Sequence, residues 1–522
     1  METIERKNVL TFSQKIPAIV NKKRISKLSQ LIKGFPVLNV MGTLEKEISS
    51  IAFDSRKVET GSLFVAIPGL KQDGSRFIQD AIGRGAVAFI TELPLDQLSA
   101  LGLVSNGLTA ICVEDSRRSL AWVSAAHYGH PSRSMNLVGI TGTNGKTTLT
   151  YILETLYQTR GVKTGVIGTI NYRYGNFQAS ASVTTPESLD INRMLADMAE
   201  YGIQDCFLEV SSHSLALRRV AEMHFSLGIF TNLSRDHLDF HADMEDYKNT
   251  KKKLFQDNVM EKQIINIDDP TGQEIVNETT RPTLTTGIDH AADIRAEHCS
   301  LSETGSKFTL KTPSGSREIH TRLLGRHNIY NLLSGAGAAY AQGFSLDEIQ
   351  QGLQAITHIP GRFERIDCGQ DFSVVVDYAH THEALAKVLT AARALTLKNV
   401  IVVFGCGGDR DQGKRKEMGR VALELGDFTV ITSDNPRTED PERIIEDILK
   451  GVPAGSKKPQ DYIVIADRKK AIEYAIDNAR SGDLVLIAGK GHENYQILNS
   501  GTIHFDDREI ATNAINQRIS CD

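Results

Sequence analysis

The chain lacks several features that would place it in a specialised class of protein. None of its 522 residues lies in an uninterrupted apolar run of eighteen, so no segment is predicted to span a bilayer. The first 26 residues contain no sustained apolar stretch, which argues against a signal peptide and predicts a short N-terminal extension. No internal repeat or low-complexity block is visible. We therefore expect a cytoplasmic globular protein without stable membrane association.

Cysteine and net charge are also sparse. There are six cysteines, at Cys112, Cys206, Cys299, Cys368, Cys406 and Cys521. They form no CxxC pair and no spacing typical of a metal site, and scattered cysteines in a long chain are typical of reduced cytosolic thiols. The net charge of −5 gives no reason to expect nucleic acid or an acidic membrane surface as a partner.

Length and hydrophobic patterning predict a multidomain α/β protein. A chain of 522 residues is too long for one core, and 40% hydrophobic with 24% charged residues is ordinary globular composition. Apolar strand-like runs alternate with amphipathic helical patterns, which predicts parallel sheets covered by helices on both faces. Breaks occur at GHPSRS (129–134) and HIPGRFERI (358–366). We expect an extension over residues 1–26 and domains over 27–134, 135–357 and 358–522.

A Gly-rich turn, TGTNGKTT (141–148), follows an apolar strand and precedes a helical pattern. In such a turn, backbone N–H groups and the helix N-terminus bind phosphate oxygens. Lys146 would reach the β- and γ-phosphates, and Thr147 would hold Mg²⁺. Ile140 stands where the common loop has its first glycine, so the loop is a variant. The strand–loop–helix context favours a nucleotide site over a chance Gly-rich turn.

Three further residues are candidates for phosphate chemistry. Glu209 ends an apolar strand, and His237 follows another in FTNLSRDHLDFH (230–241). Ligands bind at the carboxyl ends of strands in parallel sheets, so Glu209 and Thr147 can share a Mg²⁺ while His237 takes a second metal. A helix cap or a solvated charge is the alternative for each. Lys251 lies in a lysine-rich helical pattern, where spacing alone does not distinguish it from a solvated lysine.

Eleven motifs taken together resemble the Mur ligases. Between about residue 37 and residue 515 they follow the family's order: GITGTNGKTT, TTPESLD, EVSSHSL, FTNLSRDHLDFH, YKNTKKKLF, GRHNIYN, PGRFERI, DYAHTHEAL, FGCGGDRDQGKR, SDNPRTEDP and AGKGHE. The resemblance implies three α/β domains, with a P-loop parallel-sheet ATPase domain in the centre and a Rossmann-like C-terminal domain.

The resemblance also implies an activity, ATP-dependent amide-bond formation in cytoplasmic peptidoglycan precursor synthesis. In that family ATP phosphorylates a free carboxylate of the substrate, an amine attacks the acyl phosphate, and ADP and phosphate leave. Mg²⁺ and lysine suit this chemistry because they neutralise the anions that must be brought together.

Individual roles follow from the same resemblance. Residues that match the ATP site are Gly142, Thr143, Asn144, Gly145, Lys146, Thr147, Thr148, Asn328, Arg362 and Asp377. Glu209 and His237 match magnesium positions, and Lys251 matches a carbamylated lysine that helps to hold the second magnesium. With Lys146, these three residues form the expected catalytic set.

The same comparison predicts how the nucleotide-linked substrate is held. Ser55 matches a uridine-nucleotide contact. Contacts to the muramoyl-dipeptide are expected from Thr184, Thr185, Ser211 and Arg219. The chain departs from the family pattern at His327, where Phe is usual, and at Leu217, where Gln is frequent.

The motif SDNPRTEDP bears on which amine is added. In the family, Arg after Asp-Asn-Pro accompanies meso-diaminopimelate, whose second carboxylate a guanidinium can bind in a bidentate way. Glu493 would take the distal ammonium. The expected amine pocket contains Arg410, Asp434, Asn435, Pro436, Arg437, Gly489 and Glu493. The expected partners are therefore UDP-N-acetylmuramoyl-L-alanyl-D-glutamate and meso-diaminopimelate, bound by a monomer.

Three alternatives stay open at this point. If Arg437 is only a surface cation, the amine specificity is undecided, and a lysine-adding ligase of the same family is the alternative. A folylpolyglutamate synthase-like ligase shares the loop and the acyl-phosphate chemistry, but DSRKVETGSLFVAIPG (54–69) and DNPR argue against it. A non-catalytic nucleotide-binding switch has no need of the second metal site that Lys251, Glu209 and His237 imply.

Overall fold

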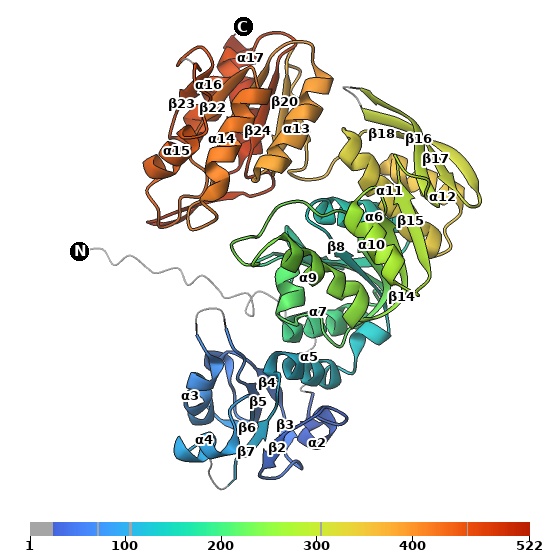
Figure 1. Ribbon diagram of the computed structural model, residues 1–522, viewed down its shortest axis with the longest axis vertical. Coiled ribbons are helices and arrows are strands. Elements are labelled where there is room, and N and C mark those ends of the chain that lie inside the picture. Colours follow the sequence, from blue (N-terminus) through green and yellow to red (C-terminus); the bar gives the residue numbers. More distant parts are fainter. Residues whose placement is uncertain (1–23, 70–71, 104–106, 303–304, 457, 522) are drawn as a thin grey trace.

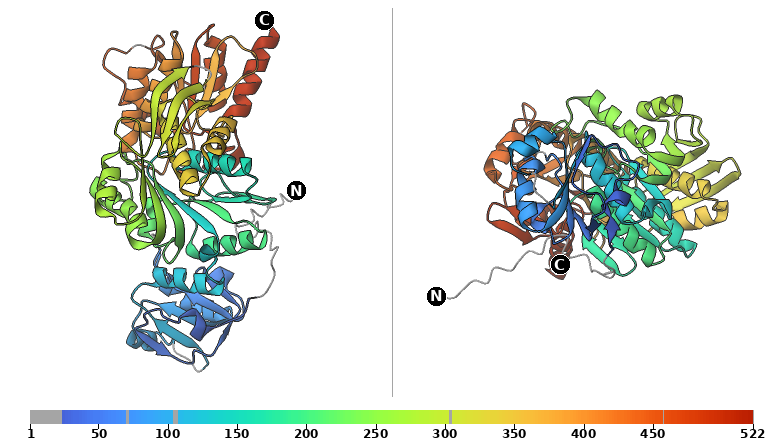
Figure 2. Two further views of the ribbon diagram at one scale, coloured as in Figure 1. Left: turned by 90° about the vertical axis from the view of Figure 1, so that its right-hand side faces the viewer. Right: turned by 90° about the horizontal axis from the view of Figure 1, so that it is seen from below.

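The computed structural model describes residues 24–69, 72–103, 107–302, 305–456 and 458–521. Three large sheets lie in successive stretches of this chain, and we call the regions built on them the N-terminal, central and C-terminal domains. The domains follow one another along the long axis of the molecule (Figure 1), and the left view of Figure 2 shows the same order. Most of the predicted N-terminal extension lies outside the described residues, and the predicted domain boundaries stay predictions.

The N-terminal domain is a five-stranded sheet in the order β2-β7-β6-β5-β4. Its strands are β2 (Asn39–Met41), β4 (Ser50–Ala52), β5 (Ser62–Val65), β6 (Ala86–Thr91) and β7 (Thr109–Cys112), with β1 (Ser26–Lys27) and β3 (Glu47–Ile48) paired separately. Its helices are α2 (Leu28–Leu31), α3 (Ile78–Gly83), α4 (Leu95–Ala100) and α5 (Ser116–His127). Strands β4 to β7 are parallel, and buried side chains of α2 and α5 fill one face while those of α3 and α4 fill the other.

The central domain is an eleven-stranded sheet in the order β11-β10-β9-β12-β8-β13-β14-β15-β16-β17-β18. Its strands are β8 (Asn136–Thr141), β9 (Thr164–Ile167), β10 (Asn171–Tyr174), β11 (Phe177–Ser180), β12 (Asp205–Glu209), β13 (His224–Phe230), β14 (Val259–Asn266), β15 (Thr283–Gly287), β16 (Ile294–Ser302), β17 (Gly305–Thr312) and β18 (Gly315–Thr321). Its helices are α6 (Lys146–Thr159), α7 (Ser188–Glu200), α8 (Ser212–Ala216), α9 (Met244–Asp257), α10 (Pro270–Glu278), α11 (Arg326–Ala341) and α12 (Leu346–Ala355). The middle of the sheet is parallel, and antiparallel strands extend both edges.

The C-terminal domain is a six-stranded sheet in the order β19-β20-β24-β21-β22-β23. Its strands are β19 (Glu364–Ile366), β20 (Ser373–Asp377), β21 (Val400–Phe404), β22 (Phe428–Ile431), β23 (Tyr462–Val464) and β24 (Leu484–Ala488), followed by the hairpin of β25 (Tyr495–Leu498) and β26 (Gly501–His504). Its helices are α13 (His382–Leu395), α14 (Gly413–Leu425), α15 (Pro441–Leu449), α16 (Arg468–Asn478) and α17 (Asp507–Cys521). Helices α13 to α15 cover one face, and α16 and α17 cover the other.

The predicted α/β fold class is therefore confirmed, with two differences in detail. The hairpin-like segment 307–323 is not a separate insert, because β17 and β18 continue the central sheet through β16. The hairpin β10–β11 has no counterpart in the sequence prediction, since its short strands carry polar residues such as Asn171 and Arg173. The cysteine side chains that the structure describes are all free thiols, as expected. No helix in the described part of the chain is long and apolar enough to cross a membrane.

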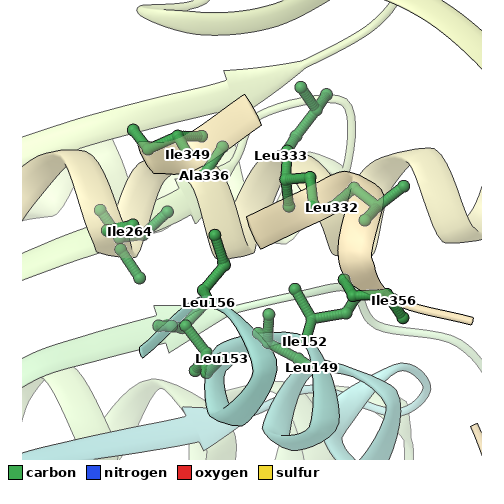
Figure 3. Packing of buried hydrophobic residues seen from close by; sticks show 14 of the residues in the cluster. Leu149, Ile152, Leu153, Leu156, Ile264, Leu332, Leu333, Ala336, Ile349 and Ile356 are labelled. Atoms are coloured by element: carbon green, nitrogen blue, oxygen red, sulfur yellow. The ribbon is translucent and has the colours of Figure 1, made fainter. Parts of the chain in front are cut away.

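One face of the central sheet fixes the helix that follows the Gly-rich turn. Side chains of α6 meet those of α11 and of the α12 segment in a packed layer (Figure 3), made up of Leu149, Ile152, Leu153, Leu156, Leu332, Leu333, Ala336, Ile349 and Ile356. The helices approach closely because α12 presents Gly352 to α6, where a Cβ would lie 2.6 Å from Leu156 Cδ2. The start of α6 is thereby held in place at the end of β8.

We expect Leu156→Ala to destabilise the protein strongly. The side chain is fully buried, and removing it leaves a cavity that typically costs about 2–5 kcal/mol of unfolding free energy. Calorimetry should show a lowered midpoint for the transition of the central domain. Leu301→Ala, at a 40% exposed leucine of the same sheet, is the matched control and should leave that midpoint nearly unchanged. Equal midpoints for the two variants would contradict this packing.

Candidate active site

The predicted catalytic residues meet at one edge of the central sheet. Parallel pairing sets Glu209 of β12 opposite Ile140 of β8, and Phe230 of β13 opposite Thr141. The three segments that leave these strands therefore start at the same edge, as expected for a ligand site in a parallel sheet.

The Gly-rich turn is braced by the segment that follows β13. Thr143 N–H donates to Asn232 O at 2.8 Å, and Asn144 N–H donates to Asn232 Oδ1 at 3.1 Å. Gly142 and Gly145 have φ of 142° and 89°, and a Cβ at Gly142 would overlap the Thr231 hydroxyl. The turn therefore needs glycine at both positions, for backbone conformation and for space.

Helix α6 begins directly after this turn and has no side-chain cap at its N-terminus. Its first N–H groups have no helical partner of their own, and a helix N-terminus carries a partial positive charge. Thr147 and Thr148 are buried in the first turn. This combination of turn and uncapped helix is suited to binding phosphate oxygens.

Two lysines converge on a single carbonyl oxygen of the turn. Lys146 Nζ donates to Gly142 O at 2.9 Å, and Lys251 Nζ of α9 donates to the same oxygen at 2.8 Å. Lys251 is only 1% exposed and lies over the ring of Tyr247. Burial and the neighbouring Lys146 charge hold the pKa of Lys251 well below its usual value, against the opposing effect of Asp236. Burial also lowers the pKa of Lys146.

Glu209 lies beside these lysines, with its carboxylate directed toward two hydroxyl groups. Thr147 Oγ1 donates to its Oε2 at 3.0 Å, and Thr169 donates from Oγ1 at 2.8 Å and from N at 2.9 Å. The glutamate is 1% exposed and has no basic partner among these contacts. Thr169 was not predicted from the sequence. It follows β9, which pairs with β12 and so brings the hydroxyl to Glu209.

His237 lies at a strained backbone position next to Asp236. It has φ of 55°, and its Nε2 lies 3.5 Å from Asp236 Oδ2. The His213 ring is perpendicular to it at a centroid distance of 5.1 Å. Burial lowers the pKa of His237 to about 4, so the ring is neutral and can act as a ligand through nitrogen. Asp236 was missed by sequence reasoning, although it lies in the motif that contains His237.

The predicted metal ligands form an unusual donor set. Among residues 24–521 that the structure describes, no three His, Cys, Asp or Glu side chains gather in a way that could hold a metal ion. Thr147 and Glu209 do lie together, joined by a hydrogen bond. Lys251 and Lys146, which precedes Thr147, both donate to Gly142 O. The predicted ligands thus present a hydroxyl, a carboxylate, an imidazole and an amine in place of a cluster of acids.

The C-terminal domain reaches this site through Arg362. Its Nη2 donates to Thr147 Oγ1 at 3.3 Å, and its guanidinium lies over the Tyr378 ring at 4.7 Å. Asp377 has a different environment from the one that a nucleotide contact suggests. Its two carboxylate oxygens accept N–H groups of Phe363 at 2.7 Å and Ala379 at 2.8 Å. In this structure Asp377 thus fixes the start of the C-terminal domain, where Phe363 directly precedes β19.

Asn328 and His327 lie at the start of α11. The Asn328 amide donates to Leu324 O at 2.8 Å and accepts from Asn331 at 3.2 Å, so its side chain is occupied by protein groups. The rings of His327 and Phe363 are arranged edge to face, with 6.5 Å between their centroids. Burial lowers the pKa of His327 to about 4. The neutral imidazole therefore takes the place of an aromatic ring at this position.

The predicted muramoyl-dipeptide contacts adjoin Glu209. Thr185 Oγ1 donates to Glu209 O at 2.7 Å and to Ser211 Oγ at 3.2 Å, and Thr184 Oγ1 lies 3.1 Å from Thr169 Oγ1. Arg219 donates to Thr185 O at 2.9 Å. Ser55 is buried in the N-terminal domain, at the start of a short helix after β4.

The predicted amine-binding residues gather in the C-terminal domain. Asn435 donates to Glu493 Oε2 at 2.8 Å, and Lys490, which is fully buried, donates to the same oxygen at 3.0 Å. Burial raises the pKa of Glu493, with Lys490 opposing that shift. Lys490 was not predicted as a member of this pocket, although it lies in the motif AGKGHE.

The remaining members of this pocket differ in how firmly they are held. Arg437 has φ of 54° and donates to Gly408 O at 2.7 Å. Gly489 has φ of 115°, and a Cβ there would lie 2.8 Å from Asp434 Oδ2. Pro436 is buried, whereas Arg410 is exposed and donates to Asp409 O. The carboxylates and the guanidinium together suit a zwitterionic amino acid.

An α/β fold in which an uncapped helix follows a Gly-rich turn, with two lysines on one carbonyl of that turn, is typical of the class of nucleotide-dependent enzymes. Family models agree: the Mur ligase family catalytic domain matches residues 47–128, the Mur ligase middle domain matches 140–339, and the Mur ligase glutamate ligase domain matches 361–491. The chain belongs to the Mur ligase family.

Individual relatives resemble the chain over nearly its whole length. The UDP-N-acetylmuramoyl-L-alanyl-D-glutamate--2,6-diaminopimelate ligase of Syntrophomonas wolfei is 44% identical over 496 residues, which cover 94% of this chain and all of the relative. A solved structure of a ligase of that name is 31% identical, with a TM-score of 0.68, and covers 95% of this chain and 99% of that one. MurF ligase from Thermotoga maritima, solved in complex with ADP, shares the fold at 18% identity and a TM-score of 0.59, over 90% of this chain and 98% of that one.

We expect Asp377→Ala to lower stability. The change leaves the buried N–H groups of Phe363 and Ala379 without acceptors, and each loss typically costs about 1–3 kcal/mol. Urea unfolding of the variant should have a lower midpoint. Asp367→Ala, which removes an acceptor for Gly369 N–H in an exposed turn, should change it little. A variant as stable as the wild type would mean that Asp377 serves only to contact a ligand.

Proposed function

We propose that the chain is an ATP-dependent ligase that joins meso-diaminopimelate to UDP-N-acetylmuramoyl-L-alanyl-D-glutamate in cytoplasmic peptidoglycan precursor synthesis. The observation that carries this function is the convergence of Lys146 and Lys251 on Gly142 O beside Glu209, with an amine pocket on a separate domain. The printed names of the relatives, at 44% and 31% identity, support the same substrates. We expect the protein to act as a monomer.

The first half of the reaction transfers the γ-phosphoryl group of ATP to a free carboxylate of the substrate. The turn from Gly142 to Thr147 would hold the phosphates with its N–H groups, and Lys146 would offset the charge that builds up during transfer. Thr184, Thr185, Ser211 and Arg219 would bind the muramoyl-dipeptide. Ser55 would bind the uridine nucleotide, and Asn328, Arg362 and Asp377 belong to the nucleotide side of the site.

Mg²⁺ fits the residues on the central sheet. The hydroxyl of Thr147 and the carboxylate of Glu209 are the hard oxygen donors that this ion prefers, and a carbamate on Lys251 would add another. His237 would complete the second position. When bound, Mg²⁺ neutralises charge on the phosphates and on the group being transferred. Lys251 is suited to carbamylation because CO₂ reacts with a neutral amine, and its pKa is low.

The second half of the reaction joins the amine to the acyl phosphate. The nitrogen lone pair attacks the acyl carbon, the bond from that carbon to the phosphate oxygen breaks, and phosphate and a proton leave. Arg437 would hold the distal carboxylate of diaminopimelate, and Glu493 its ammonium. Asp434, Asn435, Pro436, Arg410 and Gly489 complete the pocket.

Phosphate release tests the proposed function. With ATP and Mg²⁺ present, release should require both UDP-muramoyl-dipeptide and meso-diaminopimelate, because the acyl phosphate forms on one and is consumed by the other. ATP binding without phosphate release, whichever of these substrates is added, would instead indicate a non-catalytic nucleotide-binding switch.

Lys251→Ala should be nearly inactive and should recover in part with added short carboxylic acids. The carboxylate of a small acid can occupy the position of the missing carbamate. Loss of an electrostatic catalytic group of this kind typically costs roughly 10²-fold or more in kcat. The measurement is kcat with and without acetate. Lys253→Ala, at the partly exposed lysine two residues further along α9, should retain activity and show no response to acetate.

Arg437→Ala should reduce selectivity for meso-diaminopimelate over lysine. Lysine lacks the carboxylate that the guanidinium would bind, so only diaminopimelate loses a contact. A charged hydrogen bond of this kind predicts a loss of about 10-fold or more in the ratio of kcat/KM for the two amines. Arg443→Ala, at an exposed arginine of the same domain, is the control. A wild-type preference for lysine, or an unchanged ratio in Arg437→Ala, would point to the lysine-adding activity instead.

A further inference from the structure

Arg117 joins the N-terminal domain to the central domain. It lies in the first turn of α5, the helix of the N-terminal domain that packs against α7 of the central domain (Figure 1). Its Nη2 and Nε donate to Pro68 O at 2.8 Å and 3.0 Å, within its own domain. Its Nη1 lies 3.5 Å from both carboxylate oxygens of Glu187 and from Leu217 O in the central domain. The side chain is 12% exposed, so its charge is largely shielded from water.

The anchor of Arg117 in the N-terminal domain is at the same edge of the sheet as Ser55. Strands β4 and β5 are parallel neighbours, so the segments that follow them leave the sheet at the same edge. Ser55 follows β4, and Pro68 follows β5. Arg117 therefore holds the edge of the sheet that carries the predicted uridine-nucleotide contact.

The other end of Arg117 adjoins the predicted muramoyl-dipeptide contacts. The carboxylate of Glu187 also accepts a hydrogen bond from a second arginine, because Arg219 Nε donates to its Oε1 at 2.9 Å. Arg219 also donates to Thr185 O at 2.9 Å. Two arginines from different domains thus share one carboxylate that is only 15% exposed. The position of Arg219 depends on Glu187, and the charge on Glu187 is balanced by both arginines.

Arg117 makes shorter hydrogen bonds to its own domain than to the central domain. The hydrogen bonds of Arg117 within the N-terminal domain are short, whereas those to the central domain lie at the upper limit for a hydrogen bond. Because the guanidinium is rigid and planar, its bonds to Pro68 O also fix where its other edge meets Glu187. The position of Glu187 is thereby tied to that of the N-terminal domain. A ligand that spans both domains would gain affinity when this geometry is set in advance.

We infer that Arg117 is a positioning residue that couples the uridine-nucleotide end of the substrate site to the muramoyl-dipeptide end. It acts through Glu187 on Arg219 and touches neither ATP nor the amine. This inference rests on the proposed substrate, and it assigns to one side chain a share of the affinity that the whole substrate gains over UDP alone.

Calorimetric titration separates the two ends of the site. Wild-type protein is titrated with UDP and with UDP-N-acetylmuramoyl-L-alanyl-D-glutamate, and the ratio of the two Kd values measures what the muramoyl-dipeptide adds. Arg117→Met should leave the Kd for UDP unchanged and reduce that ratio about 10-fold, the usual effect of losing a charged hydrogen bond. The KM values for ATP and for the amine should stay at the wild-type level.

Arg118→Met is the matched control. Arg118 is the next residue of α5 and also pairs across the domain interface, with Glu222 at 2.9 Å, but it is 48% exposed and is not bound to Glu187. This variant should keep the wild-type ratio of Kd values. If Arg117→Met has a lowered thermal midpoint, Arg117→Lys gives the same comparison, because it keeps the charge but cannot bind Pro68 and Glu187 together.

The possible outcomes are distinct. Equal weakening of UDP and the whole substrate in the Arg117 variants, or no weakening of either, would overturn the coupling role while leaving the proposed function intact. A wild type that binds the whole substrate no better than UDP would overturn the proposed substrate itself, and the coupling role with it.

Discussion

The interaction on which the site depends is the meeting of two lysine ammonium groups at the carbonyl oxygen of Gly142. Lys146 begins the helix that follows the turn, whereas Lys251 comes from α9 on the other face of the sheet. Burial disfavours the charged form of Lys251, and the neighbouring charge of Lys146 disfavours it further, so the pKa of Lys251 falls well below its usual value. Such a site favours groups that bring negative charge to it, which in the proposed function are phosphate at Lys146 and a carbamate on Lys251.

The rest of the architecture supports this arrangement in separate ways. The packing of α6 against α11 and α12 fixes the position of Lys146, and the parallel register of β12 with β8 brings Glu209 to the same edge. The C-terminal domain carries its own buried framework, in which Arg468 and Asp507 form a paired ion bridge behind the amine pocket. Arg362 links that domain to Thr147. In the proposed function the substrates are bound by different domains, and the contact of Arg362 with Thr147 places the C-terminal domain beside the Gly-rich turn.

Much of this could be predicted from the sequence, and the remainder could not for identifiable reasons. Strands β20 to β24 and helices α13 to α16 of the C-terminal domain were predictable because apolar runs alternate there with amphipathic helical patterns, whereas β19, the hairpin β25–β26 and α17 were not predicted. Thr169, Asp236 and Lys490 were not predicted as site residues, because their roles come from tertiary placement. Thr169 reaches Glu209 only through the pairing of β9 with β12. The sequence likewise gives no sign that backbone N–H groups occupy both oxygens of Asp377.

The central claim is that Lys251 carries a carbamate, whose negative charge compensates the charge of the neighbouring Lys146. It can be tested directly by NMR with ¹³C-labelled bicarbonate. The account predicts a carbamate carbon resonance in the wild-type protein that is absent in Lys251→Met and present in Lys253→Met. A wild-type protein that incorporates no label, while remaining fully active as a ligase, would contradict it.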